Sequence, residues 1–165
     1  MSGIAYVSEV RIERPGGVLR KAYLPAEKDP VLFGVHGAVA EHYGVSPAIA
    51  EPHATTLDYV VAAAGGVLTG TFGGALEARK VTMGPEGMTS DVRGEIETED
   101  NVLIIRRIHV VYNVATPIGD REKVERAYGI HAEHCPVYRS LRAAIAITTG
   151  LDWKELSVAP PRVPA

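Results

Sequence analysis

The chain has 165 residues, of which 46% are hydrophobic and 22% charged, a length that suits one domain with a substantial buried core. It contains a single cysteine, Cys135, which excludes an intramolecular disulfide and a cysteine-based zinc finger. Seventeen basic residues stand against twenty acidic ones, for a net charge of −3. Because the basic residues form no long stripe, we expect no nucleic-acid partner.

Two stretches bear on targeting. Residues 1–10 lack a basic segment followed by an apolar run, so no signal peptide is predicted. Residues 59–76 carry no charge and have nearly the length of a membrane span. We prefer a buried helix of a soluble protein, since this stretch stands alone, is rich in Gly and Ala, and is flanked by Asp58 and Glu77. An unpaired thiol suits the cytoplasm, so a cytoplasmic protein without membrane contact is expected.

The N-terminal third begins with a predicted β-hairpin over residues 4–24. Apolar residues alternate loosely on both sides of a turn at 13–17, which contains Pro15, Gly16 and Gly17. Further along we predict a short strand at 31–35, a helix at 36–43 with Gly44 as its C-cap, and a loop at 45–53.

A central helix is predicted over about residues 55–80. Thr55 or Thr56 can cap its start, and Asp58 in the first turn suits the helix dipole. Its interior holds five glycines, each costing about 1 kcal/mol relative to alanine. They form two small-residue rows, Gly66/Gly70/Gly74 and Gly65/Thr69/Gly73, which predict close approach of another helix or a sheet. The alternatives are a loop and a phosphate-binding turn, but no nucleotide fingerprint is present.

The C-terminal half is predicted to hold a second hairpin over 88–115, turning at Asp100 and Asn101. Asp120 is the expected N-cap of a helix at 121–134, and Pro136 opens another helix to about residue 144, which gives helices across 120–145. A last strand at 144–148 and a loose tail at 158–165 follow. This order indicates an α+β domain with antiparallel sheet.

The histidines and the cysteine are the candidates for chemistry. His36 with His42, and His131 with His134 and Cys135, could be read as metal ligands, but zinc needs three or four converging groups, so no metal is expected. Cys135 precedes Pro136 at a helix start, where backbone N–H groups favour a thiolate, and protonated His131 and His134 would add positive charge. The alternative is an inert, buried thiol.

Two segments together resemble the OsmC/Ohr family of osmotically inducible and organic hydroperoxide resistance proteins. Residues 131–141, HAEHCPVYRSL, resemble its Cys-Pro segment, which follows a hairpin and a helix. Residues 56–71, TLDYVVAAAGGVLTGT, resemble its central helix, and the correspondence covers nearly the whole chain. The resemblance implies an OsmC-like fold over residues 1–165, with antiparallel sheets around a long central helix and two chains intertwined as a homodimer.

The resemblance also implies a two-cysteine peroxidase chemistry. A thiolate on the central helix attacks the peroxide oxygen and becomes a sulfenic acid, which the Cys-Pro cysteine converts into a disulfide for reduction by a dithiol. Here Cys135 matches the second cysteine, while the first position falls on Val67, which has no nucleophile. Asp58 could serve as the acidic partner, and Arg20 is a candidate for the family's arginine.

Three functional hypotheses remain open, and with them whether the chain is an enzyme. The first is a family member tied to oxidative stress, without the two-cysteine cycle, that binds a small apolar or hydroperoxide ligand at the dimer interface; its pocket candidates are Val67, Asp58 and His53. The second is a one-cysteine peroxidase whose catalytic residue is Cys135, which must then be exposed. The third is a structural dimer without ligand. None of the three calls for a cofactor.

Overall fold

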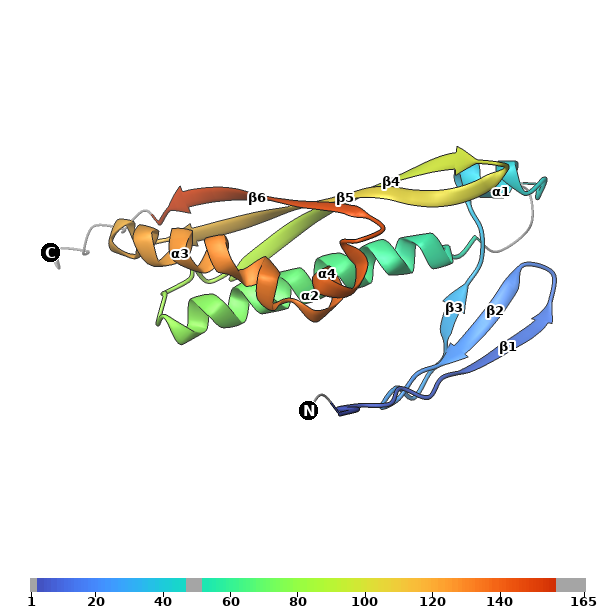
Figure 1. Cartoon of the computed structure of the whole chain (residues 1–165), viewed down its shortest axis with the longest axis horizontal. Coiled ribbons are helices and arrows are strands. Elements are labelled where there is room, and N and C mark those ends of the chain that lie inside the picture. Colours follow the sequence, from blue (N-terminus) through green and yellow to red (C-terminus); the bar gives the residue numbers. More distant parts are fainter. Residues whose placement is uncertain (1–2, 47–51, 157–165) are drawn as a thin grey trace, which may run out of the picture. The chain divides into compact units, whose positions relative to one another are not determined.

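The computed structural model describes residues 3–46 and 52–156, so the predicted tail at 158–165 and part of the predicted loop at 45–53 lie outside the described residues. The chain divides into two compact units, Met1–Tyr59 and Val60–Ala165, called here the N-terminal and C-terminal units. The element order is ββ(β)–α–α–ββ–αα–β, with the helix α2 (Thr56–Ala78) beginning in the first unit and running through the second (Figure 1).

The N-terminal unit contains a three-stranded antiparallel sheet and a short helix. Its elements are β1 (Arg11–Gly16), β2 (Leu19–Tyr23), β3 (Val31–Phe33) and α1 (Gly37–His42). The hairpin is confirmed, but pairing starts at Arg11, opposite Tyr23, and not at Ile4. Gly17 and Gly44 have φ of +56° and +64°, so glycine relieves the backbone at the hairpin turn and at the end of α1.

The central helix is confirmed with nearly the predicted bounds, and one of its two small-residue rows packs against β4 (Met88–Glu99). A Cβ on Gly65 would lie 2.4 Å from Val92 Cγ2, one on Gly73 would lie 3.4 Å from Met88 Cε, and a Cβ on Gly94 of β4 would lie 2.5 Å from Val61. Four helix residues advance about 6 Å and two strand residues about 6.8 Å, so the positions stay matched along both elements. Gly65 of α2 therefore leaves room for Val92 of β4, and Gly94 of β4 leaves room for Val61 of α2.

The other row, Gly66/Gly70/Gly74, lies on a different side of α2. A Cβ added at Gly66, Gly70 or Gly74 would meet nothing within 4 Å in the part of the chain that the structure describes. The prediction of close approach is confirmed for the Gly65 row, which faces a sheet. For the Gly66 row it stays a prediction.

The second hairpin is formed by β4 and β5 (Val102–Thr116), which pair from Met88 opposite Val114 to Glu99 opposite Val102. Asp100 and Asn101 both have positive φ, as the predicted two-residue turn requires. From Ile108 to Thr116 every second residue of β5 is buried, because that face carries the core of the C-terminal unit. The buried residues of this stretch are Ile108, Val110, Tyr112, Val114 and Thr116, and Ile105 is buried as well.

The last strand, β6 (Ala146–Glu155), differs from the prediction in length and direction. It starts near the predicted residue but continues through Gly150 to Glu155, because a glycine inside a strand looks like a strand end in the sequence. It also pairs parallel to β5. The expected antiparallel arrangement thus holds for β1–β3 and for β4 with β5, while β6 is the exception. Parallel neighbours need a crossover, which here consists of η1 (Ile118–Asp120), α3 (Arg121–His131), η2 (Ala132–His134) and α4 (Pro136–Leu141).

Asp120 is the N-cap residue of α3, as predicted, but its side chain makes no capping hydrogen bond. Asp120 ends η1 with helical backbone angles, so its carboxylate does not reach the free N–H groups of α3. The carboxylate instead accepts a hydrogen bond from the Thr82 backbone N–H at 3.1 Å and pairs with Lys123 at 2.5 Å. Asp120 therefore ties the segment after α2 to the start of α3.

Candidate functional site

The start of α2 is fixed by a compact set of hydrogen bonds around Asp58, all within the N-terminal unit. Thr55 Oγ1 accepts from the Asp58 backbone N–H at 3.1 Å, and Asp58 Oδ2 accepts from the backbone N–H and the hydroxyl of Thr55 at 2.6 and 2.7 Å. This reciprocal pattern is a capping box, and it selects Thr55 over Thr56 as the cap. His36 Nε2 lies 2.9 Å from the same oxygen.

These contacts set the charge of Asp58. Burial alone raises the pKa of this carboxyl, but the hydrogen bonds from Thr55 and His36 outweigh burial and leave the pKa below its ordinary value. Asp58 is therefore ionised near neutral pH, and its Oδ2 atom already takes part in three of these contacts. In this geometry its main role is to hold the helix start.

His53, the other pocket candidate of this unit, packs against the backbone that follows β3. A Cβ on Gly34 would lie 2.8 Å from His53 Cβ, and the Gly34 N–H donates to the Ala54 carbonyl at 3.0 Å. The lack of a side chain at Gly34 thus lets the segment before α2 approach β3. Arg20 lies on β2, half-buried, in register with Phe33.

Cys135 is fully buried and caps α4, as the Cys-Pro sequence predicts. Its Sγ accepts a hydrogen bond from the Tyr138 backbone N–H at 3.4 Å, and Pro136 occupies the first turn of the helix. The segment is braced from outside by Glu133, whose two carboxylate oxygens accept from Arg142 Nη1 at 2.6 and 2.7 Å. The thiol is held inside the protein, away from solvent.

A buried aromatic cluster lies near Cys135 in the core of the C-terminal unit. It joins α2, β5 and α3 and consists of Phe72, Tyr112, Tyr128 and His131, with ring centroids 4.8–6.2 Å apart. Burial raises the pKa of Tyr112 above its ordinary value, and the neighbouring Tyr128 and Cys135 add to the rise.

His131 is the polar centre of this cluster. Its Nδ1 lies 2.7 Å from the Tyr128 carbonyl, which can only accept, so Nδ1 carries the proton and Nε2 accepts from the Tyr112 hydroxyl at 2.8 Å. Burial lowers the pKa of His131 below its ordinary value, although the Tyr128 carbonyl opposes this shift. The expectation that His131 adds positive charge near Cys135 is therefore wrong, because the site favours the neutral ring.

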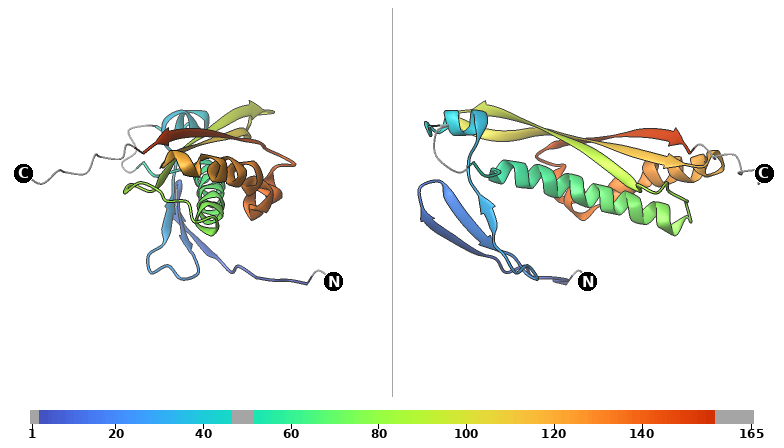
Figure 2. Two further views of the ribbon diagram at one scale, coloured as in Figure 1. Left: turned by 90° about the vertical axis from the view of Figure 1, so that its left-hand side faces the viewer. Right: turned by 180° about the vertical axis from the view of Figure 1, so that it is seen from behind.

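Val67 lies in the middle of α2, and its side chain is half-buried. Its carbonyl accepts a hydrogen bond from Thr71 Oγ1 at 2.8 Å. The helix α4, which directly follows Cys135, lies beside α2 in all three views (Figures 1 and 2). The sequence predicts a role for Val67 and Cys135. It does not distinguish Tyr112 from the other residues of its strand, in which apolar residues alternate.

No three His, Cys, Asp or Glu side chains in residues 3–46 and 52–156 gather where they could hold a metal ion. The helix α2 is long and apolar enough to cross a membrane by composition, with a mean hydropathy of 1.4 and 28% of the window buried. One such helix is weak evidence, since the core helix of a soluble protein passes the same test.

A central helix packed on a hairpin and followed by a Cys-Pro helix is the arrangement of an OsmC-like protein. The family model described as OsmC-like protein matches residues 50–150, more than half of the chain, and the chain belongs to this family. Proteins of this family are generally soluble. A search of curated protein sequences gives no match.

Solved structures of this family share the fold over nearly their whole length. The organic hydroperoxide resistance protein OhrB of Bacillus subtilis is 14% identical with a TM-score of 0.64, covering 90% of this chain and 100% of its own. An OsmC-like protein of unknown function from Vibrio cholerae is 11% identical with a TM-score of 0.71, covering 89% and 99%. An OsmC-like protein from Mycoplasma pneumoniae is 11% identical with a TM-score of 0.68, covering 93% and 99%. At these identities the likeness establishes the fold.

Proposed function

We propose that this chain is a cytoplasmic OsmC/Ohr-like protein of the response to organic hydroperoxides that lacks the family's two-cysteine peroxidase cycle. It would retain a pocket for a small apolar or hydroperoxide ligand. The single observation that carries the proposal is the cysteine count: a chain with one cysteine cannot form the intramolecular disulfide on which that cycle depends. Val67 stands where the family's sequence pattern has the attacking thiolate.

The environment of Cys135 supports the loss of the cycle. A thiol attacks a peroxide as an accessible thiolate, whereas Cys135 is fully buried and its sulfur accepts the Tyr138 N–H. These contacts also weigh against the alternative of a one-cysteine peroxidase. Cys135 then acts as a packing and capping residue.

The pocket would form when two copies associate through α2. The exposed Gly66, Gly70 and Gly74 lie four residues apart on one side of this apolar helix, so two such helices could approach closely. Val67 adjoins this row in sequence and would then lie near the interface. In a dimer without ligand, the third hypothesis, the same helix contact would be present but the pocket would stay empty.

Sedimentation velocity tests the association, with Gly70→Leu to obstruct the row and Glu125→Gln as a surface control on α3. We expect a dimeric wild type, a dimeric Glu125→Gln and a monomeric Gly70→Leu. A monomeric wild type at micromolar concentration would contradict the homodimer, and with it a pocket built at its interface.

Hydroperoxide consumption with a dithiol reductant tests the chemistry. We expect no turnover by the wild type or by Cys135→Ser, and measurable turnover by Val67→Cys, with Val67→Ser as the control for a polar side chain at this place. Hydroperoxide turnover by the wild type that disappears in Cys135→Ser would establish a one-cysteine peroxidase and contradict the proposal.

A further inference from the structure

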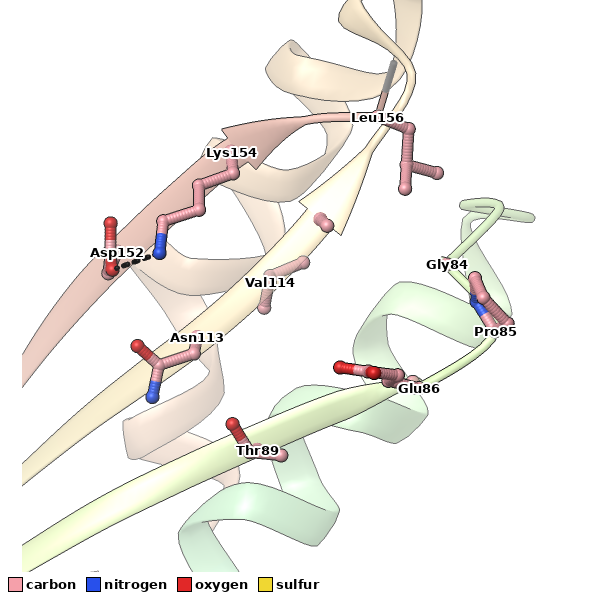
Figure 3. Close-up of a pocket in the computed structure, with 11 residues that line it drawn as sticks. Gly84, Pro85, Glu86, Thr89, Asn113, Val114, Asp152, Lys154 and Leu156 are labelled. Carbon is pink, nitrogen blue, oxygen red and sulfur yellow. Dashed lines mark ion pairs between the residues drawn. The ribbon is translucent and has the colours of Figure 1, made fainter. Parts of the chain in front are cut away.

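The C-terminal unit has a hollow of about 330 Å³ where the loop before β4 faces the ends of β5 and β6 (Figure 3). None of the four site residues named from the sequence lines it. Its volume is at the small end of the range for ligand pockets. The hollow therefore has room for one small organic molecule.

The two sides of the hollow are held to β5 by backbone hydrogen bonds. The Gly84 N–H donates to the Ala115 carbonyl at 3.1 Å, and the Leu156 N–H donates to the Thr116 carbonyl at 2.9 Å. A Cβ on Gly84 would lie 2.9 Å from Leu156 Cδ2, so glycine lets the loop come this close to Leu156. The apolar part of the lining, which includes Pro85, is thus in place before any ligand arrives.

The charged side chains that line the hollow are Glu86, Asp152 and Lys154. Lys154 Nζ lies 3.3 Å from Asp152 Oδ2, so these two charges offset each other. The Glu86 carboxylate points from its loop toward β5 (Figure 3), and within the described residues it has no hydrogen-bond or ion-pair partner. The lining therefore carries one uncompensated negative charge.

The neutral polar groups also present oxygen atoms. The Asn113 Nδ2 group donates one of its two hydrogen atoms to Asp91 at 2.9 Å, and the Asn113 carbonyl oxygen can accept a hydrogen bond from a ligand. The Thr89 hydroxyl lies on the same side as Glu86 (Figure 3). Acceptors beside an uncompensated carboxylate suit a ligand that is a cation and a hydrogen-bond donor.

We propose that this hollow binds a small organic cation: a primary ammonium group on an apolar body of a few carbon atoms. The ammonium group pairs with the Glu86 carboxylate, and the body packs against Pro85 and Leu156. A carboxylate ligand of the same size is disfavoured, since Glu86 repels it and Lys154 is already paired with Asp152. The proposal is independent of the peroxidase question.

This proposal can be tested by titrating the full chain with ligands and monitoring its backbone amide signals by NMR. The ligands are n-butylamine, n-butanol and butyrate, which have similar shapes but are positively charged, neutral and negatively charged. At pH 7 we expect n-butylamine to shift the signals of Gly87 and Asn113 and to bind about five- to tenfold more tightly than n-butanol. Butyrate should bind least. Glu86→Gln should abolish the advantage of the amine, while Glu155→Gln, an exposed neighbour of Lys154 outside the lining, should keep it.

Equal affinity of the wild type for n-butylamine and n-butanol would overturn the proposal, as would an advantage for the amine that persists in Glu86→Gln. Absence of any shift at Gly87 and Asn113 would do the same. The wild-type comparison of the three probes decides the matter even if Glu86→Gln fails to fold.

Discussion

Replacing Gly65 by alanine should destabilise the protein, whereas the same change at the adjacent Gly66 should not. The Cβ introduced at position 65 would lie 2.4, 3.0 and 3.2 Å from Val92 Cγ2, Cγ1 and Cβ. Rotation of this valine gives no relief, because its χ1 is stiff and all three carbons are too close. Overpacking of this kind costs about 1–3 kcal/mol, and the better helix propensity of alanine returns about 1 kcal/mol. We expect a net loss of up to about 2 kcal/mol in the free energy of unfolding.

Urea denaturation followed by circular dichroism measures these differences, with Gly66→Ala as the matched control. Within one chain, a Cβ at Gly66 meets nothing within 4 Å among the described residues, so at concentrations where the chain is monomeric this variant should be as stable as the wild type or more stable by up to about 1 kcal/mol. Val92→Ala makes room for the new methyl group, so Gly65→Ala should cost less in the Val92→Ala background than alone. If Gly65→Ala is as stable as Gly66→Ala, or if Val92→Ala does not reduce its cost, the packing of α2 on β4 is not as described.

Three further predictions concern Asp58, His131 and Cys135. Asp58→Asn should lower the free energy of unfolding by about 1 kcal/mol at pH 7, because it weakens the capping box. The native pKa of Asp58 is lowered, so this difference from the wild type, measured by urea titration, should disappear as the pH falls below that pKa. His131 has a lowered native pKa, so below about pH 6.5 the unfolded protein binds more protons than the native protein, and the stability of the wild type should fall as the pH is lowered further. This loss of stability should be smaller in His131→Phe. An equal loss in the wild type and the variant would contradict the neutral buried ring. The Cys135 thiol should react with a thiol reagent slowly in the native protein and rapidly in denaturant; rapid native labelling would show that the sulfur is not held inside.

The sequence predicted the elements whose signals are local. The turn at Asp100 and Asn101 and the end of α1 at Gly44 follow from residues that tolerate positive φ. The start of α2 follows from the spacing of Thr55 and Asp58, which together make the capping box. Each of these features depends on residues within a few positions of one another.

The sequence did not predict what depends on distant partners. Asp120 has the residue type of an N-cap, but its carboxylate is drawn to Thr82 and Lys123. The parallel pairing of β6 depends on a crossover that periodicity cannot reveal. His131 was expected to add charge beside Cys135, yet its burial lowers its pKa and favours the neutral ring, against the opposing effect of the Tyr128 carbonyl.

We propose that Val67 occupies the place of a lost peroxidatic cysteine, so a thiol introduced there should react with Cys135. The most direct measurement is the intact mass of Val67→Cys after treatment with one equivalent of an organic hydroperoxide, with tryptic mapping of the product. We expect loss of two hydrogen atoms and a peptide joining residue 67 to Cys135, while the peroxide is reduced to its alcohol and water. A product in which the introduced thiol is oxidised to sulfinic acid and Cys135 remains free would contradict the claim.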